Sequence, residues 1–132
     1  MSSSMAKWRL LVVLVSSLAL GGCFLVAAGA GAGAAVVFTN RGAKSVVDGT
    51  VDQAFDRSVI AFQQLSITES GRATEESGAK RRLEGKKGDL DVTVELTRES
   101  ATTTSAEVYA RKNLVEYDKN FARDVLTRII QK

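Results

Sequence analysis

The chain has 132 residues, with 11 Gly, no Pro, no His and one Cys. Without His and with a single Cys, it holds neither a Cys/His zinc site nor a Ser-His-Asp or Cys-His catalytic set, and no internal disulfide. The formal charge is +3, but residues 1–22 carry two of the basic residues and no acid, so the remainder has 16 basic and 15 acidic side chains. This balance does not favour nucleic acid as a partner. We expect no enzyme, no cofactor and no metal.

The first 22 residues have the order of a secretory signal peptide. Lys7 and Arg9 give a short cationic start. An apolar run, residues 10–20, follows and is rich in Leu and Val. Small residues then lead to Cys23. We therefore expect residues 1–22 to direct export and to be removed.

The sequence Leu20-Gly21-Gly22-Cys23 resembles the bacterial lipobox. The thiol of Cys23 would accept a diacylglyceryl group, because a thiol is the strongest nucleophile among the side chains at neutral pH. Gly21 and Gly22 leave room for the signal peptidase, and Leu20 fits an apolar subsite. The alternative is a buried free thiol in a membrane helix. Phe24 stands where an Asp often signals retention in the inner membrane, so the outer membrane, facing the periplasm, is favoured.

A Gly/Ala-rich tract, residues 29–34, follows the lipobox. Its letters match a dinucleotide-binding fingerprint, but that motif requires a preceding strand, and here a signal peptide precedes it. We interpret residues 23–39 as a lipidated Cys and a flexible tether. The alternative is a membrane-inserted helix that self-associates through Gly29 and Gly33, which have the spacing of a helix-dimer motif.

The remaining residues, 40–132, are expected to form one small domain with both signs of charge interspersed. A short strand over 43–48 comes first. Thr50 and Gln53 then have the spacing of a capping box, which predicts a helix over 51–65. Its apolar stripe comprises Val51, Ala54, Phe55, Ser58, Val59, Phe62 and Leu65.

Four strand-like segments follow this helix. Residues 90–97 alternate apolar and polar side chains, which is typical of a half-buried strand, and residues 85–89 form the turn before them. The segments 66–74, 80–86 and 106–110 are the other three. A last helix over 118–131 begins at Asp118, a suitable cap. Its apolar face comprises Phe121, Ala122, Val125, Leu126, Ile129 and Ile130.

This order, β-α-β-β-β-β-α, predicts an α+β fold with a four- to five-stranded, mostly antiparallel sheet and two helices packed on one face. The other face is expected to be polar and open to a partner. A cavity between sheet and helices would instead indicate a binding module for a small apolar ligand. The open face would carry Thr93, Glu95, Thr97, Glu107, Tyr109 and Arg111, and the cavity would be lined by Phe55, Phe62, Val94, Val125 and Ile129.

A basic cluster coincides with a predicted hairpin of the domain. One interpretation is contact with anionic lipid headgroups or an acidic partner. The other is a solvated edge strand, on which Lys and Arg discourage pairing with another chain. Nearby acidic residues partly cancel the field and favour the second interpretation. The cluster comprises Lys80, Arg81, Arg82, Lys86 and Lys87, and the acids are Glu75, Glu76, Glu84 and Asp89.

Five features together resemble a family of small bacterial lipoproteins that has no established activity. They are the lipobox, the Gly/Ala tract, the short strand, the helix start Thr50-Val51-Asp52-Gln53-Ala54-Phe55 and the terminal Arg128-Ile129-Ile130. The resemblance implies a place in the cell envelope and a β-α-β4-α domain, and no catalytic residues. We expect a lipid-anchored protein with a structural or interaction role and an envelope protein as partner. The alternative is a single-pass membrane protein that keeps its N-terminal helix.

Overall fold

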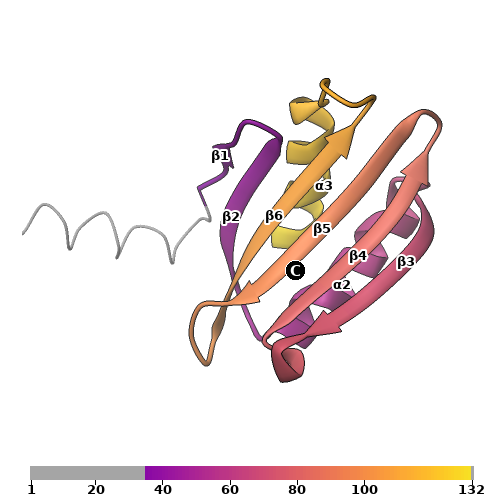
Figure 1. The fold of residues 1–132 in the computed structure, drawn as a ribbon. Coiled ribbons are helices and arrows are strands. Elements are labelled where there is room, and N and C mark those ends of the chain that lie inside the picture. Colours follow the sequence, from indigo (N-terminus) through magenta and orange to yellow (C-terminus); the bar gives the residue numbers. More distant parts are fainter. Residues whose placement is uncertain (1–34, 132) are drawn as a thin grey trace, which may run out of the picture. The chain divides into compact units, whose positions relative to one another are not determined.

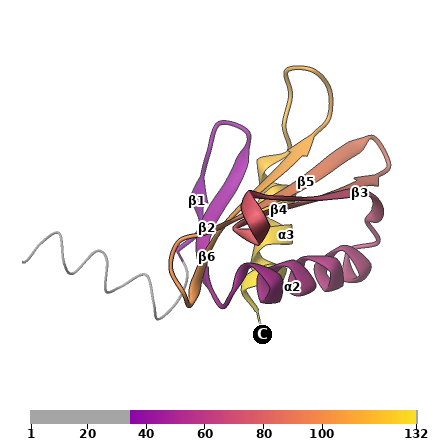
Figure 2. The same ribbon diagram turned by 60° about the horizontal axis from the view of Figure 1, so that its bottom comes forward.

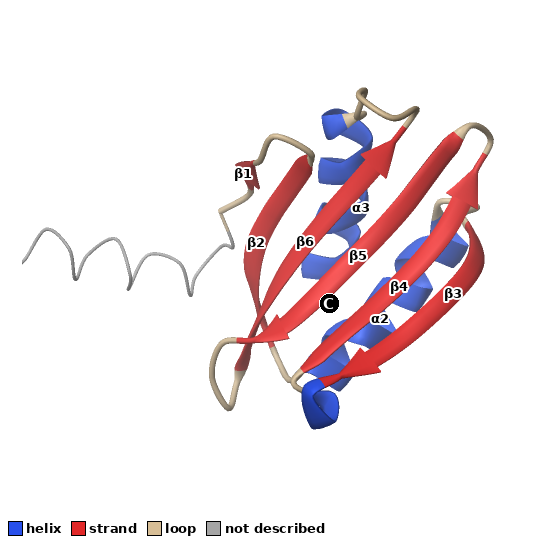
Figure 3. Ribbon diagram, in the orientation of Figure 1, coloured by secondary structure: helices blue, strands red, loops and turns tan. Residues whose placement is uncertain are grey.

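The computed structural model describes residues 35–131, which form one antiparallel sheet and two α-helices (Figure 1). The predicted α+β class is confirmed (Figure 3). In chain order the elements are β1 (Val37–Phe38), β2 (Gly42–Asp48), α2 (Val51–Gln64), β3 (Thr68–Glu75), the 3-10 turn η1 (Glu76–Gly78), β4 (Lys80–Lys87), β5 (Leu90–Arg98), β6 (Thr103–Arg111) and α3 (Lys119–Ile130).

The sheet has six strands in the order β1-β2-β6-β5-β4-β3, and every neighbouring pair is antiparallel. Both helices pack on the same face, as Figure 2 shows. The sixth strand, β1, is one more than the sequence predicted. It lies in the apolar stretch before residue 40, and a strand of two residues is too short to show the alternation that would distinguish it from a tether.

The first helix begins where its sequence predicts. The backbone N–H of Gln53 donates to Thr50 Oγ1 at 3.2 Å, and the N–H of Thr50 donates to Gln53 Oε1 at 3.0 Å, so the predicted capping box is present. The buried side of α2 comprises Val51, Ala54, Phe55, Ser58, Ala61 and Phe62. Val59 and Leu65 of the predicted stripe are only partly buried.

The second helix supplies the other half of the layer over the sheet. Asp118 caps it, because Asp118 Oδ1 accepts from the N–H of Phe121 at 2.9 Å. The buried side chains of α3 are Ala122, Val125, Leu126 and Ile129, while Phe121 and Ile130 pack at the edge of the core. These residues meet the inward side chains of the strands, among them Val47, Leu83, Val92, Val94, Leu96, Ala106 and Val108.

The outer strand on the β3 side differs from the sequence-based prediction. We expected the basic segment 80–86 to be an edge strand, and this is wrong: β4 lies between β3 and β5. The edge strand is β3, whose polar sequence and irregular register between Glu69 and Gly71 discourage pairing with another chain. The turn between β4 and β5 is also shorter than predicted, since β4 continues to Lys87.

Within residues 35–131, no helix is both long enough and apolar enough to cross a membrane. The predicted signal peptide, lipobox and Gly/Ala tract lie outside the described residues.

Candidate functional site

The sheet face opposite the helices is the candidate site, and we call it the open face. Alternation along the strands places its side chains: Thr93 of β5 lies opposite Tyr109 of β6, and Glu95 lies opposite Glu107. The six residues predicted for this face occupy these alternate positions of β5 and β6. Neither helix covers this side of the sheet (Figure 2).

Tyr109 is the centre of the open face. Its hydroxyl donates to Glu95 Oε2 at 3.1 Å and accepts from Arg41 Nη2 at 3.3 Å. The guanidinium of Arg41 also lies over the ring, 4.4 Å from its centroid. Arg41 belongs to the turn between β1 and β2, and the next residue, Gly42, lies opposite Tyr109 in the β2–β6 pair. Only 8% of Tyr109 is exposed as a result.

Arg82 extends the same network to β4. Its Nη2 lies 3.4 Å from Glu95 Oε1, and its Nη1 lies 3.8 Å from Glu84 Oε1. Glu95 therefore joins Tyr109 and Arg82 through its two carboxylate oxygens. The Nε of Arg82 is buried and has no hydrogen-bond partner among the described residues. A buried donor without a partner is costly, so a ligand that accepts from it would gain free energy.

The environment of Tyr109 keeps its phenol protonated. Burial raises the pKa of Tyr109 well above its usual range, and the negative charges of Glu95 and Glu107 act in the same direction. Tyr109 is thus a hydrogen-bond donor and acceptor across the ordinary pH range. It does not serve as a base there.

The open face is hollowed at this network. The hollow has a volume of about 250 Å³. Arginines and carboxylates alternate around it, and Asp91 is paired with Lys86 at 3.3 Å and with Arg111 at 3.7 Å. Such a surface matches a partner of mixed charge better than a simple anion. The residues that line it are Arg41, Arg82, Glu84, Asp91, Thr93, Glu95, Tyr109, Arg111 and Tyr117.

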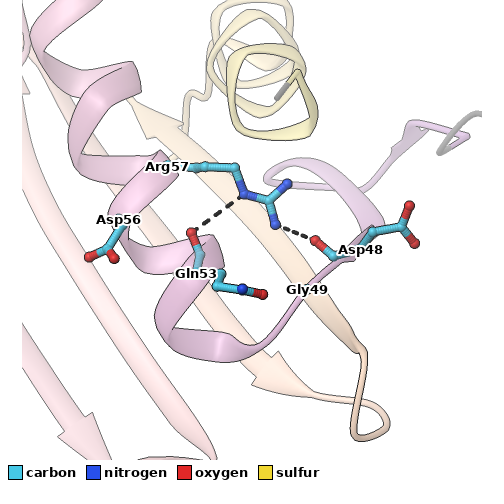
Figure 4. A pocket seen from close by; sticks show the side chains of 5 residues that line it. All are labelled: Asp48, Gly49, Gln53, Asp56 and Arg57. Carbon is cyan, nitrogen blue, oxygen red and sulfur yellow. Dashed lines mark hydrogen bonds between the residues drawn. The ribbon is translucent and has the colours of Figure 1, made fainter.

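A second hollow, of about 460 Å³, lies where β2 passes into α2 (Figure 4). Its polar groups already serve the fold. Arg57 donates from Nη2 to the carbonyl oxygen of Asp48 and from Nε to that of Gln53. Asp56 points away from Arg57 in Figure 4, so the two do not form a binding pair. We therefore assign this hollow a structural role.

The predicted basic cluster is divided by the alternation of β4. Lys80, Arg82 and Lys86 lie on the open face, whereas Arg81 and Lys87 lie on the helix face. Arg81 stacks on Phe55 with its Cζ 3.6 Å from the ring centroid. Contact of these five basic residues with one headgroup or partner stays a prediction. The five side chains are spread over both ends and both faces of β4.

The residues that the apolar-ligand alternative requires are packed together. Phe55, Phe62, Val94, Val125 and Ile129 are each at most 2% exposed and belong to one continuous core. Both hollows described above lie outside this core. Across residues 35–131, no three His, Cys, Asp or Glu side chains gather as metal ligands would.

Sequence reasoning missed Arg41 and the part that Arg82 plays in the network. Arg41 lies 68 residues from Tyr109, and no local pattern links positions so far apart. The predicted lipidation at Cys23, the peptidase recognition by Leu20, Gly21 and Gly22, and the self-association through Gly29 and Gly33 fall outside the described residues. No protein-family model and no curated protein matches this sequence.

Proposed function

We propose that this protein is an exported bacterial lipoprotein. Acylated Cys23 anchors it in the envelope, facing the periplasm from the outer membrane, and the α+β domain binds an envelope protein through the open face. The lipobox-like sequence Leu20-Gly21-Gly22-Cys23 supports the anchor. Two or more acyl chains give stable attachment where a single chain does not. The proposal assigns no catalysis to the domain.

The observation that supports the binding role is the Arg41–Tyr109–Glu95–Arg82 network. Four polar side chains from four separate parts of the chain converge on a face that neither α2 nor α3 covers. Their mutual bonds hold them in fixed positions, which lowers the entropy lost when a partner binds. The mixed charge of the hollow favours a protein segment with both acidic and basic side chains.

The anchor is tested by the intact mass of the protein extracted from membranes. We expect residues 1–22 to be absent and acyl mass to be present, and Cys23→Ser to carry no acyl mass. Trp8 is the only tryptophan, so the mature protein should also show no tryptophan emission. A full-length, unmodified chain would support the single-pass alternative instead.

The binding role is tested by photo-crosslinking in intact cells. A crosslinker at Thr93, on the open face, should give a discrete adduct with one envelope protein. The matched position is Ile60, which is 50% exposed on α2 and should give none. Arg82→Glu should weaken the adduct, since it places an acid beside Glu84 and Glu95. Equal adducts from both positions would contradict the assignment of this face.

A further inference from the structure

The loop between β6 and α3 is held in shape by its own hydrogen bonds and has an apolar tip. Asn113 Oδ1 accepts from the backbone N–H of Val115 at 3.0 Å and from that of Glu116 at 2.9 Å. At the base of the loop the N–H of Lys112 donates to the carbonyl of Glu116 at 2.9 Å, and an isolated bridge joins Arg111 to Tyr117. These bonds fix which side chains stand at the tip.

Leu114 and Val115 occupy that tip, and each is 88% exposed. Exposing two adjacent aliphatic side chains to water is unfavourable. An exposed apolar pair on a loop that is held by hydrogen bonds is therefore a candidate contact site. These side chains do not pack in the core, because the loop projects beyond the end of the sheet (Figure 1).

The same end of the sheet carries an excess of positive charge. Register places the segments 39–41, 86–91 and 111–119 together there, along the upper margin in Figure 1; each is a turn or loop with the adjoining ends of its strands or helix. They hold six basic and four acidic side chains, whereas the corresponding segments 48–50, 75–80 and 98–103 at the opposite end hold two basic and four acidic ones. The basic residues at the loop end are Arg41, Lys86, Lys87, Arg111, Lys112 and Lys119.

Three of the four acids at the loop end are already engaged. Glu116 pairs with Lys112 at 3.6 Å, Asp91 pairs with Lys86 and Arg111, and Asp118 caps α3. An apolar tip at an end of the sheet with net positive charge matches the surface of an anionic bilayer, where aliphatic side chains enter the acyl boundary and cations meet phosphate groups. A flat protein interface would instead present a broad apolar patch with few charges at its centre.

We propose that this end of the domain contacts anionic phospholipid, with Leu114 and Val115 inserted below the headgroups. The inference builds on the proposed lipid anchor, which keeps the domain close to a bilayer. Eleven residues separate Cys23 from Ala35, and a chain of that length reaches about 40 Å. Ala35 is bound beside Ser45, and the strand β1 runs from there towards the loop end. In this orientation the open face stands sideways and stays accessible.

The experiment uses the absence of tryptophan from the mature chain. The full chain is produced as Leu114→Trp, extracted, and reconstituted in vesicles of phosphatidylethanolamine and phosphatidylglycerol whose acyl chains are brominated. Bromine quenches tryptophan that enters the bilayer. The matched control is Thr102→Trp, an exposed position in the turn at the opposite end of the sheet.

We expect Leu114→Trp emission to fall by roughly half in brominated vesicles, because insertion at the tip reaches only the upper acyl region. Thr102→Trp emission should fall by roughly a tenth or less, because this residue lies at the opposite end of the sheet. Quenching of Leu114→Trp should be weaker in vesicles of brominated phosphatidylcholine, because this lipid has no net negative charge. Equal quenching in both lipids would overturn the anionic preference.

The other outcomes separate this inference from the anchor itself. If the protein floats with the vesicles and Leu114→Trp is no more quenched than Thr102→Trp, the loop contact is wrong and the anchor stands. A blue-shifted but unquenched Leu114→Trp would identify a protein contact at the tip and overturn the membrane contact. If the protein does not float with vesicles, both the anchor and the loop contact are wrong.

Discussion

Single residues determine how closely the sheet and helices approach each other. Gly85 of β4 lies beneath the end of α2, and a Cβ built on it would stand 2.7 Å from Phe62 Cε2 and 2.8 Å from both Ile67 Cγ2 and the Thr68 carbonyl. No side chain fits in that space without displacing its neighbours. The lack of a side chain at Gly85 therefore brings α2 and β4 into contact.

Gly85→Ala should lower the free energy of unfolding by about 1–3 kcal/mol, because the added methyl group overpacks the core. Gly71→Ala is the matched control on β3, where the nearest atom to the new Cβ is Glu84 Oε2 at 3.5 Å. Its effect should stay within about 0.5 kcal/mol. Urea denaturation measures both, and equal losses would contradict the packing argument.

Tyr109 gives a prediction about pH. Its pKa is raised in the folded state, chiefly by burial, from a usual value of 10.0. Above that value the unfolded chain releases the phenol proton while the folded chain retains it. The stabilisation that this group contributes is therefore present below pH 10 and decreases as the pH rises further.

Tyr109→Phe should be less stable than the wild type by about 1 kcal/mol at neutral pH, because the bonds to Glu95 and Arg41 are lost. At about pH 11 the difference should narrow, since only the wild type loses stability through the phenol. Denaturation of both proteins at the two pH values cancels the contribution of the lysines. A difference that stays constant with pH would contradict the raised pKa.

At the scale of elements, Arg81 connects β4 to the first turn of α2. Its guanidinium stacks on Phe55, and its Nη1 lies 3.0 Å from Asp52 Oδ1. The Arg81 side chain is 20% exposed, whereas that of Asp52 is 80% exposed. The ion pair is therefore screened by water, and the contact with the ring contributes most.

Arg81→Ala should destabilise the domain by about 1–2 kcal/mol through loss of this stacking and of the packed stem. Asp52→Ala should cost less, because an exposed partner contributes little. Arg98→Ala, at the exposed end of β5, is the control for loss of an arginine and should change stability by less than about 0.5 kcal/mol. A larger loss for Asp52→Ala than for Arg81→Ala would show that the ion pair dominates.

At the scale of the whole molecule, as described over residues 35–131, the sheet packs against both helices on one side, and neither helix covers the other side. One core joins both helices to β2, β4, β5 and β6. On the outer edge, β1 pairs with β2, and Ser45 Oγ donates to the Ala35 carbonyl at 3.1 Å. The sheet therefore begins before residue 40, where the sequence placed the start of the domain.

This boundary is tested with two fragments, 35–132 and 40–132. The longer fragment should unfold in one cooperative step, since it contains the whole described core. The shorter one loses β1 and exposes the edge of β2, so it should be less stable by about 1 kcal/mol and more prone to self-association. Urea denaturation and sedimentation velocity measure the two effects. Equal behaviour of the fragments would place the boundary at residue 40.

The sequence alone determined the α+β class, both helices, their caps at Thr50 and Asp118, and the alternation that gives the sheet an open polar face. These features depend on spacings of two to four residues, where periodicity and capping act locally. Tertiary structure alone decided the internal place of β4, the pairing of β1, the meeting of Arg41 with Tyr109, and the common end shared by Leu114 and the basic turns. Each of these depends on which strands become neighbours, and strand order is fixed by the packing of the whole core rather than by any one segment.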